Sequence, residues 1–445
     1  MKALLRRAIV IGILSWLAAT GAVPAQAKAT DFGAWVRAPN LDEGHVAHTA
    51  TLLKDGRVLI AGGTDVYGVP RASSELFDPN VNRWARAADM IHARASHAAT
   101  LLSDGSVLVT GGETGLGIFP SELLASAEIY HPTSNSWTAA AAMHVPRWMP
   151  SVIGLRDGRV LVVGGTNLAP GSLLPAVEEE QAEVYDPHSD SWAFAGSGLP
   201  PLSGQAATLM PDGTVLLTGG STDMGFATVS AEIFEPATNR WQPTTWPMAR
   251  PPRYGHTATL LPDGKVLLMG GYTTKPQSVG GIDYPASELL TTSEIFDLRG
   301  NTWAPVGYST IPRFEHSATL LRNGTVLAVG SAYASNADSQ IFDPKNTWQW
   351  TSTGRQMDRY LHTATMLADG RVLIAGGYGV GSPTTAWIFS AVSGESAPSG
   401  NPPILLAAGI LVALLTVIGL IATSGRLSRR RAGTIREDDS KWIDP

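Results

Sequence analysis

The sequence predicts an all-β fold, a seven-bladed β-propeller with four antiparallel strands per blade. One sequence motif, here called the first phrase, recurs seven times. A second motif, the second phrase, follows it and contains a tryptophan at a regular spacing. One more strand-like segment with a tryptophan lies near the N-terminus. Self-similarity at a fixed period is the signature of repeat architectures. The 47 glycines, 30 prolines and 16% charged residues of the 445-residue chain agree with a turn-rich β protein.

The first phrase reads as two strands joined by a tight turn. In its first copy, His48–Gly63, the turn is Asp55-Gly56, and every other copy has Asp-Gly or Asn-Gly there. These dipeptides predict a two-residue type I′ hairpin. The strand after the turn is almost wholly apolar, which predicts that neighbouring blades cover both of its faces. The other six copies begin at His97, Pro150, Gln205, His256, His316 and His362.

The second phrase supplies two further strands. In the first unit Glu75 precedes Trp84 by nine residues, and five units keep this interval. The residues between them include turn formers, so each unit has strands A, B and C and an outer strand D that carries the tryptophan. In the sixth unit the corresponding pair is Gln340 and Trp348, with an interval of eight.

The seventh unit has no tryptophan strand of its own. Gly33-Ala34-Trp35-Val36 precedes the first unit, and Trp35 lies 13 residues before His48, the spacing also seen from Trp84 to His97. We therefore expect the N-terminal strand to complete the last blade. This arrangement closes the ring and removes exposed sheet edges.

These motifs together resemble the kelch repeat. The paired glycines, the aromatic in Glu-Ile-Phe-Asp and the spaced tryptophan carry the resemblance over about residues 33–390. The chain is similar to secreted bacterial kelch proteins and to the propeller of galactose and glyoxal oxidases. This resemblance implies seven blades. Arg147–Ser151 also resembles the Arg-Trp-Tyr-Pro stretch of copper-radical oxidases. Those enzymes need a tyrosine cross-linked to cysteine, and this chain has no cysteine, so no copper, other metal or cofactor is expected.

The two ends predict secretion and membrane anchoring. Residues 1–27 have the basic start, apolar stretch and Ala-Gln-Ala end of a signal peptide. The propeller is expected at 28–390, a flexible linker at 391–402, a transmembrane helix at 403–423 and a cytoplasmic tail at 424–445. Four arginines directly after the apolar segment place that end inside. The prediction is a single-pass type I plasma-membrane protein with an extracytoplasmic propeller.

The charge balance argues against nucleic acid as a partner. The leader holds three basic residues, and the tail holds six basic and four acidic ones. The remaining chain has 23 basic and 34 acidic residues and a net charge of −11. Phosphate binding needs a basic surface. The expected partner is a protein or glycan outside the cell.

Loop lengths predict which face binds. The loop between strands B and C varies from 8 to 22 residues, whereas the A–B turn is constant. Because strands alternate in direction, the B–C loops share a face with the D–A connections. Insertions collect on the binding face of a repeat protein. Neutral drift in exposed loops is the alternative.

A ring of arginines on this face is the candidate ligand site. Five of seven units have arginine three residues before strand A, while His45 and Leu202 occupy the other two positions, and in four units an aromatic follows. Arginine matches carboxylate or phosphate bidentately, so an anionic glycan or acidic peptide is the expected ligand. The alternative is that each arginine caps a loop carbonyl of its blade. The candidate ligand-binding residues are Arg94, Arg147, Trp148, Arg253, Tyr254, Arg313, Phe314, Arg359 and Tyr360.

The function predicted is an extracytoplasmic recognition module. The histidines that open strand A in five units are expected to bond the adjacent blade rather than to bind metal. No Ser-His-Asp spacing, paired-carboxylate signature or phosphate loop names a reaction. A carbohydrate-active enzyme of epimerase or mutarotase type is the alternative, because another secreted bacterial kelch family resembles that class. A structural scaffold is the third candidate.

Overall fold

The computed structural model describes residues 33–391 apart from short gaps, and all of them lie in one compact unit. None of these residues forms a helix long and apolar enough to cross a membrane. The expected signal peptide, transmembrane helix and tail, and the linker beyond Ala391, lie outside the described residues. The gaps are 116–121, 166–181, 198, 200–201, 223–224, 250, 280–281, 332–336, 346–347 and 380–382.

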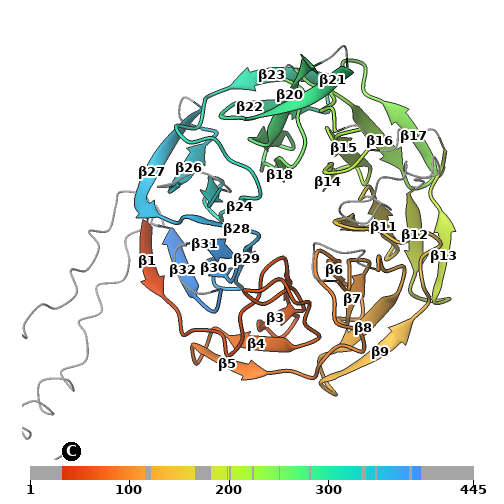
Figure 1. Ribbon diagram of the computed structural model, residues 1–445, viewed down its shortest axis with the longest axis vertical. Helices are drawn as coiled ribbons and strands as arrows, with labels where there is room; N and C mark the ends of the chain where they lie inside the picture. Colours follow the sequence, from red (N-terminus) through yellow and green to blue (C-terminus); the bar gives the residue numbers. More distant parts are fainter. Residues whose placement is uncertain are drawn as a thin grey trace, which may run out of the picture. The chain divides into compact units, whose positions relative to one another are not determined.

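Seven four-stranded antiparallel sheets are arranged in a ring, which confirms the predicted propeller (Figure 1). Blade one contains β2 (Thr49–Leu52), β3 (Val58–Ala61), β4 (Ser74–Asp78) and β5 (Arg83–Arg86). Blade two contains β6 (Ala98–Leu101), β7 (Val107–Thr110), β8 (Ala127–His131) and β9 (Ser136–Ala140). Blade three contains β10 (Ser151–Gly154), β11 (Val160–Val163), β12 (Glu183–Asp186) and β13 (Ser191–Phe194). Blade four contains β14 (Ala206–Leu209), β15 (Val215–Thr218), β16 (Ala231–Glu235) and β17 (Arg240–Pro243).

Blades five to seven follow the same plan with additions. Blade five contains β18 (Thr257–Leu260), β19 (Val266–Met269), β22 (Ser293–Asp297) and β23 (Thr302–Val306), and its B–C loop forms the hairpin β20 (Tyr272–Val279) and β21 (Ile282–Leu289). Blade six contains β24 (Ser317–Leu320), β25 (Val326–Val329), β26 (Asp338–Asp343) and β27 (Gln349–Gln356). Blade seven contains β29 (Thr363–Met366), β30 (Val372–Ala375), β32 (Ala386–Ala391) and β1 (Gly33–Arg37). A separate two-stranded sheet is formed by β28 (Arg359–Tyr360), just before β29, and β31 (Tyr378–Gly379), just after β30.

The hydrophobic core lies between the blades. Every B strand is buried along its whole length, as its apolar sequence predicts. Among the described residues, one cluster of buried side chains fills each interface between neighbouring blades. The cluster between blades seven and one, for example, joins Val58, Ile60 and Phe77 to Leu373 and Ile388. Burial is shared around the ring, so each blade depends on both of its neighbours.

The N-terminal strand closes the ring, as the sequence predicts. β1 pairs antiparallel with β32 over five residues, and Trp35 lies opposite Phe389. The Trp35 indole N–H donates to Thr353 Oγ1 in blade six at 3.1 Å. Trp35 thus has the role that the tryptophan of strand D has in other blades.

The A–B turn differs from the type I′ hairpin expected from the sequence. In blade one Gly56 N donates to Leu53 O, and Leu53 N donates to Arg57 O, so the loop has three residues. Gly56 has a φ of +88° whereas Asp55 is not among the residues with positive φ. This is a type I turn followed by a left-handed glycine, the usual three-residue hairpin. The Asp55 carboxylate accepts from Arg57 N instead.

The tryptophan assignment in blade six was wrong by two residues. Phe342 lies opposite Trp350, as Phe296 lies opposite Trp303 in blade five. Trp350 is therefore the outer-strand tryptophan. Trp348 lies in the turn before β27 with a φ of +57°. Blades one to five have Asn or Asp with positive φ at this point: Asn82, Asn135, Asp190, Asn239 and Asn301.

Candidate ligand-binding face

The B–C loops and the D–A connections lie together, as strand alternation predicts. In blade two Ala95 bridges Glu113, and in blade five Tyr254 bridges Tyr272. In blade seven the same pairing is the two-stranded sheet of β28 and β31. The longest B–C loop is the hairpin of β20 and β21, which connects β19 to β22 in blade five (Figure 1). The face with the variable loops is therefore also the face with the predicted site residues.

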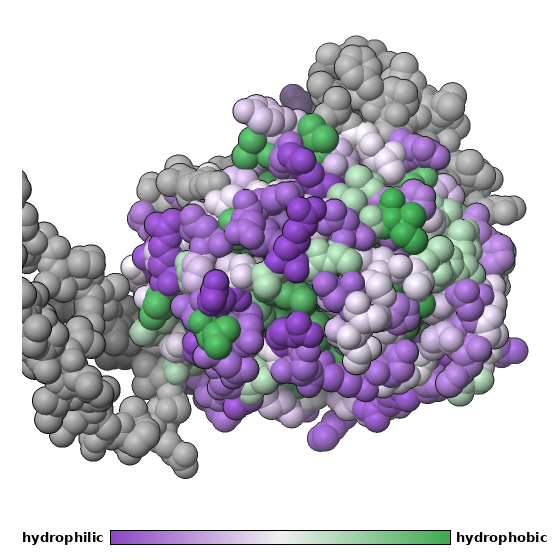
Figure 2. Space-filling model, turned by 90° about the horizontal axis from the view of Figure 1, so that it is seen from below, coloured by the Kyte–Doolittle hydropathy of each residue, from purple (hydrophilic) through white to green (hydrophobic). Residues whose placement is uncertain are grey.

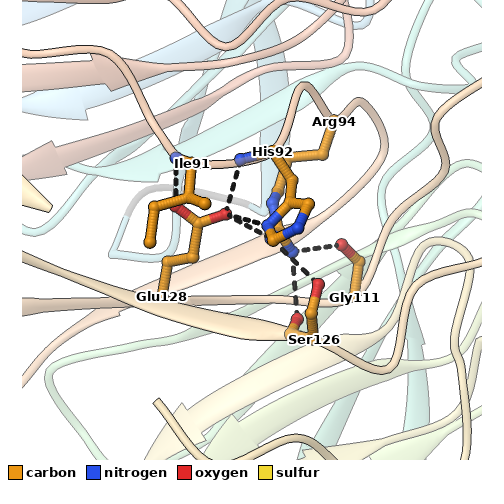
Figure 3. Close-up of polar contacts among 6 residues, drawn as sticks. All are labelled: Ile91, His92, Arg94, Gly111, Ser126 and Glu128. Carbon is orange, nitrogen blue, oxygen red and sulfur yellow. Dashed lines mark hydrogen bonds and ion pairs between the residues drawn. The ribbon is translucent and has the colours of Figure 1, made fainter. Parts of the chain in front are cut away.

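The predicted arginines are buried and bonded within their own blades. Figure 3 shows Arg94, whose guanidinium donates to the carbonyl oxygens of Gly111 and Ser126 at 3.0 Å. It also contacts the buried Glu128 carboxylate at 2.6 Å. Glu128 in turn accepts the backbone N–H groups of Ile91 and His92. The arginine and the glutamate together tie the D–A connection to strands B and C.

The bond to the glycine carbonyl recurs in the other blades that have the arginine. Arg147, Arg253, Arg313 and Arg359 each donate to the carbonyl of the glycine 17 residues later. In blade one His45 replaces arginine and contacts Gly62 O and Glu75. Arg94, Arg147, Arg253 and Arg313 are at most 1% exposed and Arg359 is 6% exposed. These contacts agree with the alternative stated from the sequence, in which each arginine caps a loop carbonyl of its blade. They do not favour arginines whose guanidinium groups are free to bind an anionic ligand.

Burial does not remove the charge of Arg313 and Arg359. Burial lowers the pKa of Arg313 and of Arg359 to about 10, so both are protonated at neutral pH. Burial also raises the pKa of Glu294, the carboxylate 3.1 Å from Arg253, to about 7, and the charge of Arg253 opposes that rise. Such pairs are costly to break, because the remaining partner is a buried charge without compensation.

The predicted aromatics lie nearer the surface than the arginines. Tyr254, Tyr272 and Phe314 form an aromatic cluster that joins blades five and six. The Tyr272 ring lies 5.6 Å from Tyr254 and 4.3 Å from Phe314, centroid to centroid. All three are half-buried. Gly255, with a φ of +62°, leaves the space that the Phe314 ring occupies, because an added Cβ would lie 2.2 Å from Phe314.

The other two predicted aromatics lie in separate blades. The Trp148 indole N–H donates to the buried Glu113 carboxylate at 3.0 Å. Tyr360 contacts Tyr378 at a centroid distance of 5.7 Å. The structure thus brings Tyr254 and Phe314 together, with Tyr272 added from the long hairpin. Tyr272 was missed in the sequence although it directly follows the paired glycines of blade five.

Glu315 is a second residue that sequence reasoning missed. It follows Phe314, has a φ of +51° and is half-buried. Burial raises the pKa of its carboxyl group to about 7. Ala47, Ser96, Met149, Gly204, Gly255 and Leu361 hold the same place in the other blades. Glu315 is thus the one acidic residue in this series, which was a visible signal in the sequence.

The series also links the blades through its backbone. Ser96 N donates to Ala47 O at 2.9 Å, Met149 N donates to Ser96 O at 2.9 Å, and Ala47 N donates to Leu361 O at 3.0 Å. These bonds join blades seven, one, two and three at the start of their inner strands.

The strand-opening histidines bond adjacent blades, as predicted. His97 Nε2 lies 3.0 Å from Thr49 Oγ1, and His48 Nε2 lies 2.9 Å from Thr363 Oγ1, across the closure of the ring. Burial lowers the pKa of His97 and of His316 to about 3, so both are neutral at ordinary pH. Within the described part of the chain, no three histidine or acidic side chains gather as a metal site would require. With the absence of cysteine, these residues do not fit the copper centre that the oxidase resemblance brings with it.

Exposed hydrophobic side chains are scattered over the side of the ring shown in Figure 2. They appear there as small separate groups among polar residues. Isolated exposed hydrophobic residues are normal on a protein surface. This side of the molecule therefore offers no broad apolar patch to compete with the aromatic cluster as a binding site.

Comparison with protein families detects one kelch motif, over residues 94–144. The chain is 26% identical over 303 residues to a galactose oxidase of Gibberella zeae, a match that covers 52% of this chain and 43% of that protein. It is 30% identical over 238 residues to alpha-scruin of Limulus polyphemus, which covers 51% of this chain and 24% of that protein. The chain thus spans less than half of either relative.

Two solved structures share the fold. A fungal alcohol oxidase of the AA5 family, solved with copper, superposes with a TM-score of 0.64 at 19% identity, over 81% of this chain and 76% of that one. YjhT superposes with a TM-score of 0.54 at 17% identity, over 71% of this chain and 99% of that one. At these identities the likeness concerns the fold alone.

Proposed function

Because the chain is a kelch-repeat β-propeller related to galactose oxidase, we propose that it is a recognition module. Its ligand, a protein or glycan, would bind on the face of the B–C loops and D–A connections. Kelch propellers generally serve as protein-interaction modules. The aromatic cluster of Tyr254, Tyr272 and Phe314 is the observation that carries the proposal.

The aromatic cluster is held in position by backbone hydrogen bonds and by packing. Tyr254 and Tyr272 exchange two backbone hydrogen bonds, of 3.0 and 2.9 Å, so the D–A connection and the hairpin move together. Gly255 has no side chain, so the Phe314 ring can pack directly against its backbone. A rigid aromatic surface loses little conformational entropy when a ligand binds, and aromatics are common anchors of interfaces.

The chemistry of this surface bears on the ligand. An anionic ligand was expected from the arginines, and it stays a prediction that their burial does not support. Aromatic rings offer stacking to a sugar face or to an apolar side chain. We therefore place the ligand contact on the aromatic cluster, with the arginines as the support behind it.

We expect Tyr254→Ala and Phe314→Ala each to weaken ligand binding by about 10- to 100-fold, the scale of an aromatic anchor. The assay is binding of the purified chain to a glycan and peptide array, followed by titration of each captured ligand. Arg253→Ala is the contrasting variant. We expect it to lower the melting temperature and to leave affinity per folded molecule unchanged.

The same titrations test the two sites against each other. If Arg253→Ala loses affinity at full stability while both aromatic variants bind normally, the arginine site is correct and the aromatic proposal fails. Binding should also be compared at pH 5.5 and pH 8.5, because Glu315 ionises in this interval. A pH effect that persists in Glu315→Gln comes from another group.

A carbohydrate-active enzyme is the second candidate, and Glu315 favours it. A carboxyl group whose pKa lies near 7 is suited to exchange protons at neutral pH. Any saccharide captured in the array should therefore be followed by NMR for change at its anomeric or neighbouring carbons. Conversion that is lost in Glu315→Gln while binding remains would replace the recognition proposal.

We propose further that the propeller is displayed outside the plasma membrane, on the expected helix at 403–423. The arginines that follow this apolar segment support that orientation. Protease added to intact cells is expected to digest the propeller and leave a small membrane fragment with the tail. Spheroplasts serve as a control where an outer membrane shields the protein. A propeller that is protected in both and digested only after lysis would contradict outward display.

A further inference from the structure

We propose that the outer rim between blades five and six holds a separate site, the rim site, for neutral saccharide rings. A cavity of about 660 Å³ lies there against β23, the outer strand of blade five. Ile295, Ala304 and Val306 form its apolar wall, and Tyr308 and Trp348 supply aromatic rings. Lys265 and Asp297 add polar groups. The volume is in the usual range for small-molecule sites.

The cavity exists because blade six departs from the repeat. In blades two, three and five the side chain of the turn before strand D accepts a hydrogen bond from the preceding blade, and in blade two Asn135 Oδ1 accepts from Ala88 N at 3.0 Å. The outer tryptophan does the same, and Trp137 Nε1 donates to Ala88 O at 2.9 Å. Asp190 and Trp192 repeat both bonds to Ala141.

Blade six uses different contacts. Trp350 Nε1 donates to Ser293 Oγ, at the start of β22 rather than at the end of β23. Trp348 occupies the turn position of the asparagines, where its side chain cannot make their bond. The outer strand of blade five is therefore left with a cavity beside it, which Trp348 borders.

Trp348 itself is an unusual choice for this position. A bulky aromatic at a φ of +57° is a rare backbone state, whereas asparagine tolerates it. Such outliers cluster at functional sites. The ring is only half-buried, and Tyr308 is 71% exposed. Two aromatic rings thus line one cavity at a cost that the other blades avoid.

The polar groups narrow the class of ligand. The Lys265 ammonium lies 5.9 Å from the Trp348 ring and would repel a cation. It is also paired with Asp263 at 3.0 Å, and Asp297 lies in the same cavity, so an anion is disfavoured. An extended peptide added to β23 would meet Pro305, which has no N–H to donate. A neutral saccharide matches what remains, because it stacks on aromatic rings and bonds charged groups through its hydroxyls.

The test uses neutral oligosaccharides of glucose, xylose, mannose and galactose, titrated against the purified full chain. We expect binding of at least one series at millimolar concentration or below. Trp348→Asn, which restores the residue of the other blades, should reduce that binding at least tenfold and keep the fold. Tyr308→Ala should reduce it similarly. Trp246→Ala is the matched control, an exposed rim tryptophan outside the cavity that should leave binding unchanged.

Several results would overturn the rim site. One is that no neutral series binds more tightly to the wild-type chain than to Trp348→Asn. Another is that Trp246→Ala reduces binding as strongly as Trp348→Asn. Sedimentation should be measured alongside, because a dimer lost in Trp348→Asn would make the cavity a protein interface. Tyr254→Ala separates this proposal from the previous one, since it should leave rim binding intact.

Discussion

Deletion of residues 28–40 is expected to abolish cooperative thermal unfolding of the propeller and to cause aggregation. The deletion removes β1, which pairs with β32 over five residues and covers Phe389 with Trp35 at a centroid distance of 4.8 Å. Without it, β32 becomes an edge with unpaired N–H and C=O groups, and such edges recruit other chains. Circular dichroism melting with light scattering measures both effects.

Two point variants show whether the strand or its side chain matters. Trp35→Ala should destabilise the propeller by about 3–5 kcal/mol, the range for loss of a packed aromatic. Val36→Ala, at a neighbouring position that is 58% exposed, should change stability little. An unchanged melting curve for the deletion would contradict closure of the ring by the N-terminal strand.

Arg94→Ala is expected to destabilise the propeller by about 3–5 kcal/mol, because it leaves the buried Glu128 carboxylate without its charged partner. The variant also removes donors to Gly111 O and Ser126 O. Chemical denaturation of the wild-type and variant chains measures the difference. Ligand affinity per folded molecule should not change, since Arg94 is fully buried.

Blade six provides the matched control for this pair. There Arg313 contacts the neutral Gln340 at 3.0 Å in place of a glutamate. Glu128→Gln should therefore cost much less than Glu128→Ala, because the amide oxygen can still accept from the arginine and from the connection. Equal losses in the two Glu128 variants would show that charge, rather than the acceptor, holds the D–A connection.

Most of the fold could be predicted because the repeats are regular. The A–B phrase gave the number of blades, and the unmatched Trp35 gave the strand that closes the ring. The histidines were interpreted correctly, since a residue repeated at one blade position contacts the next blade. Errors arose where one copy departs from the rest, as with Trp348 and Trp350. The tryptophan interval alone could not show that blade six has a longer turn.

The candidate site was harder to predict because position and exposure are different properties. The sequence places Arg253 and Tyr254 side by side, yet the arginine is 1% exposed and the tyrosine is half-buried. The glutamate that pairs with Arg253 lies 41 residues later, as the second residue of β22. The aromatic cluster needs Tyr272 from the hairpin, and Glu315 matters through its surroundings. None of these relations has a local signature.

The pairing of β1 with β32 also determines how the propeller would respond to a pulling force. Gly33 and Ala391 lie opposite each other at one end of this strand pair, so the chain enters and leaves the ring at a single rung. Tension between the two ends would load that rung first and then peel the pair apart rung by rung, rather than shearing five rungs at once. The other six blades would bear no load until β1 came away. Under tension, β1 is therefore the strand expected to detach first.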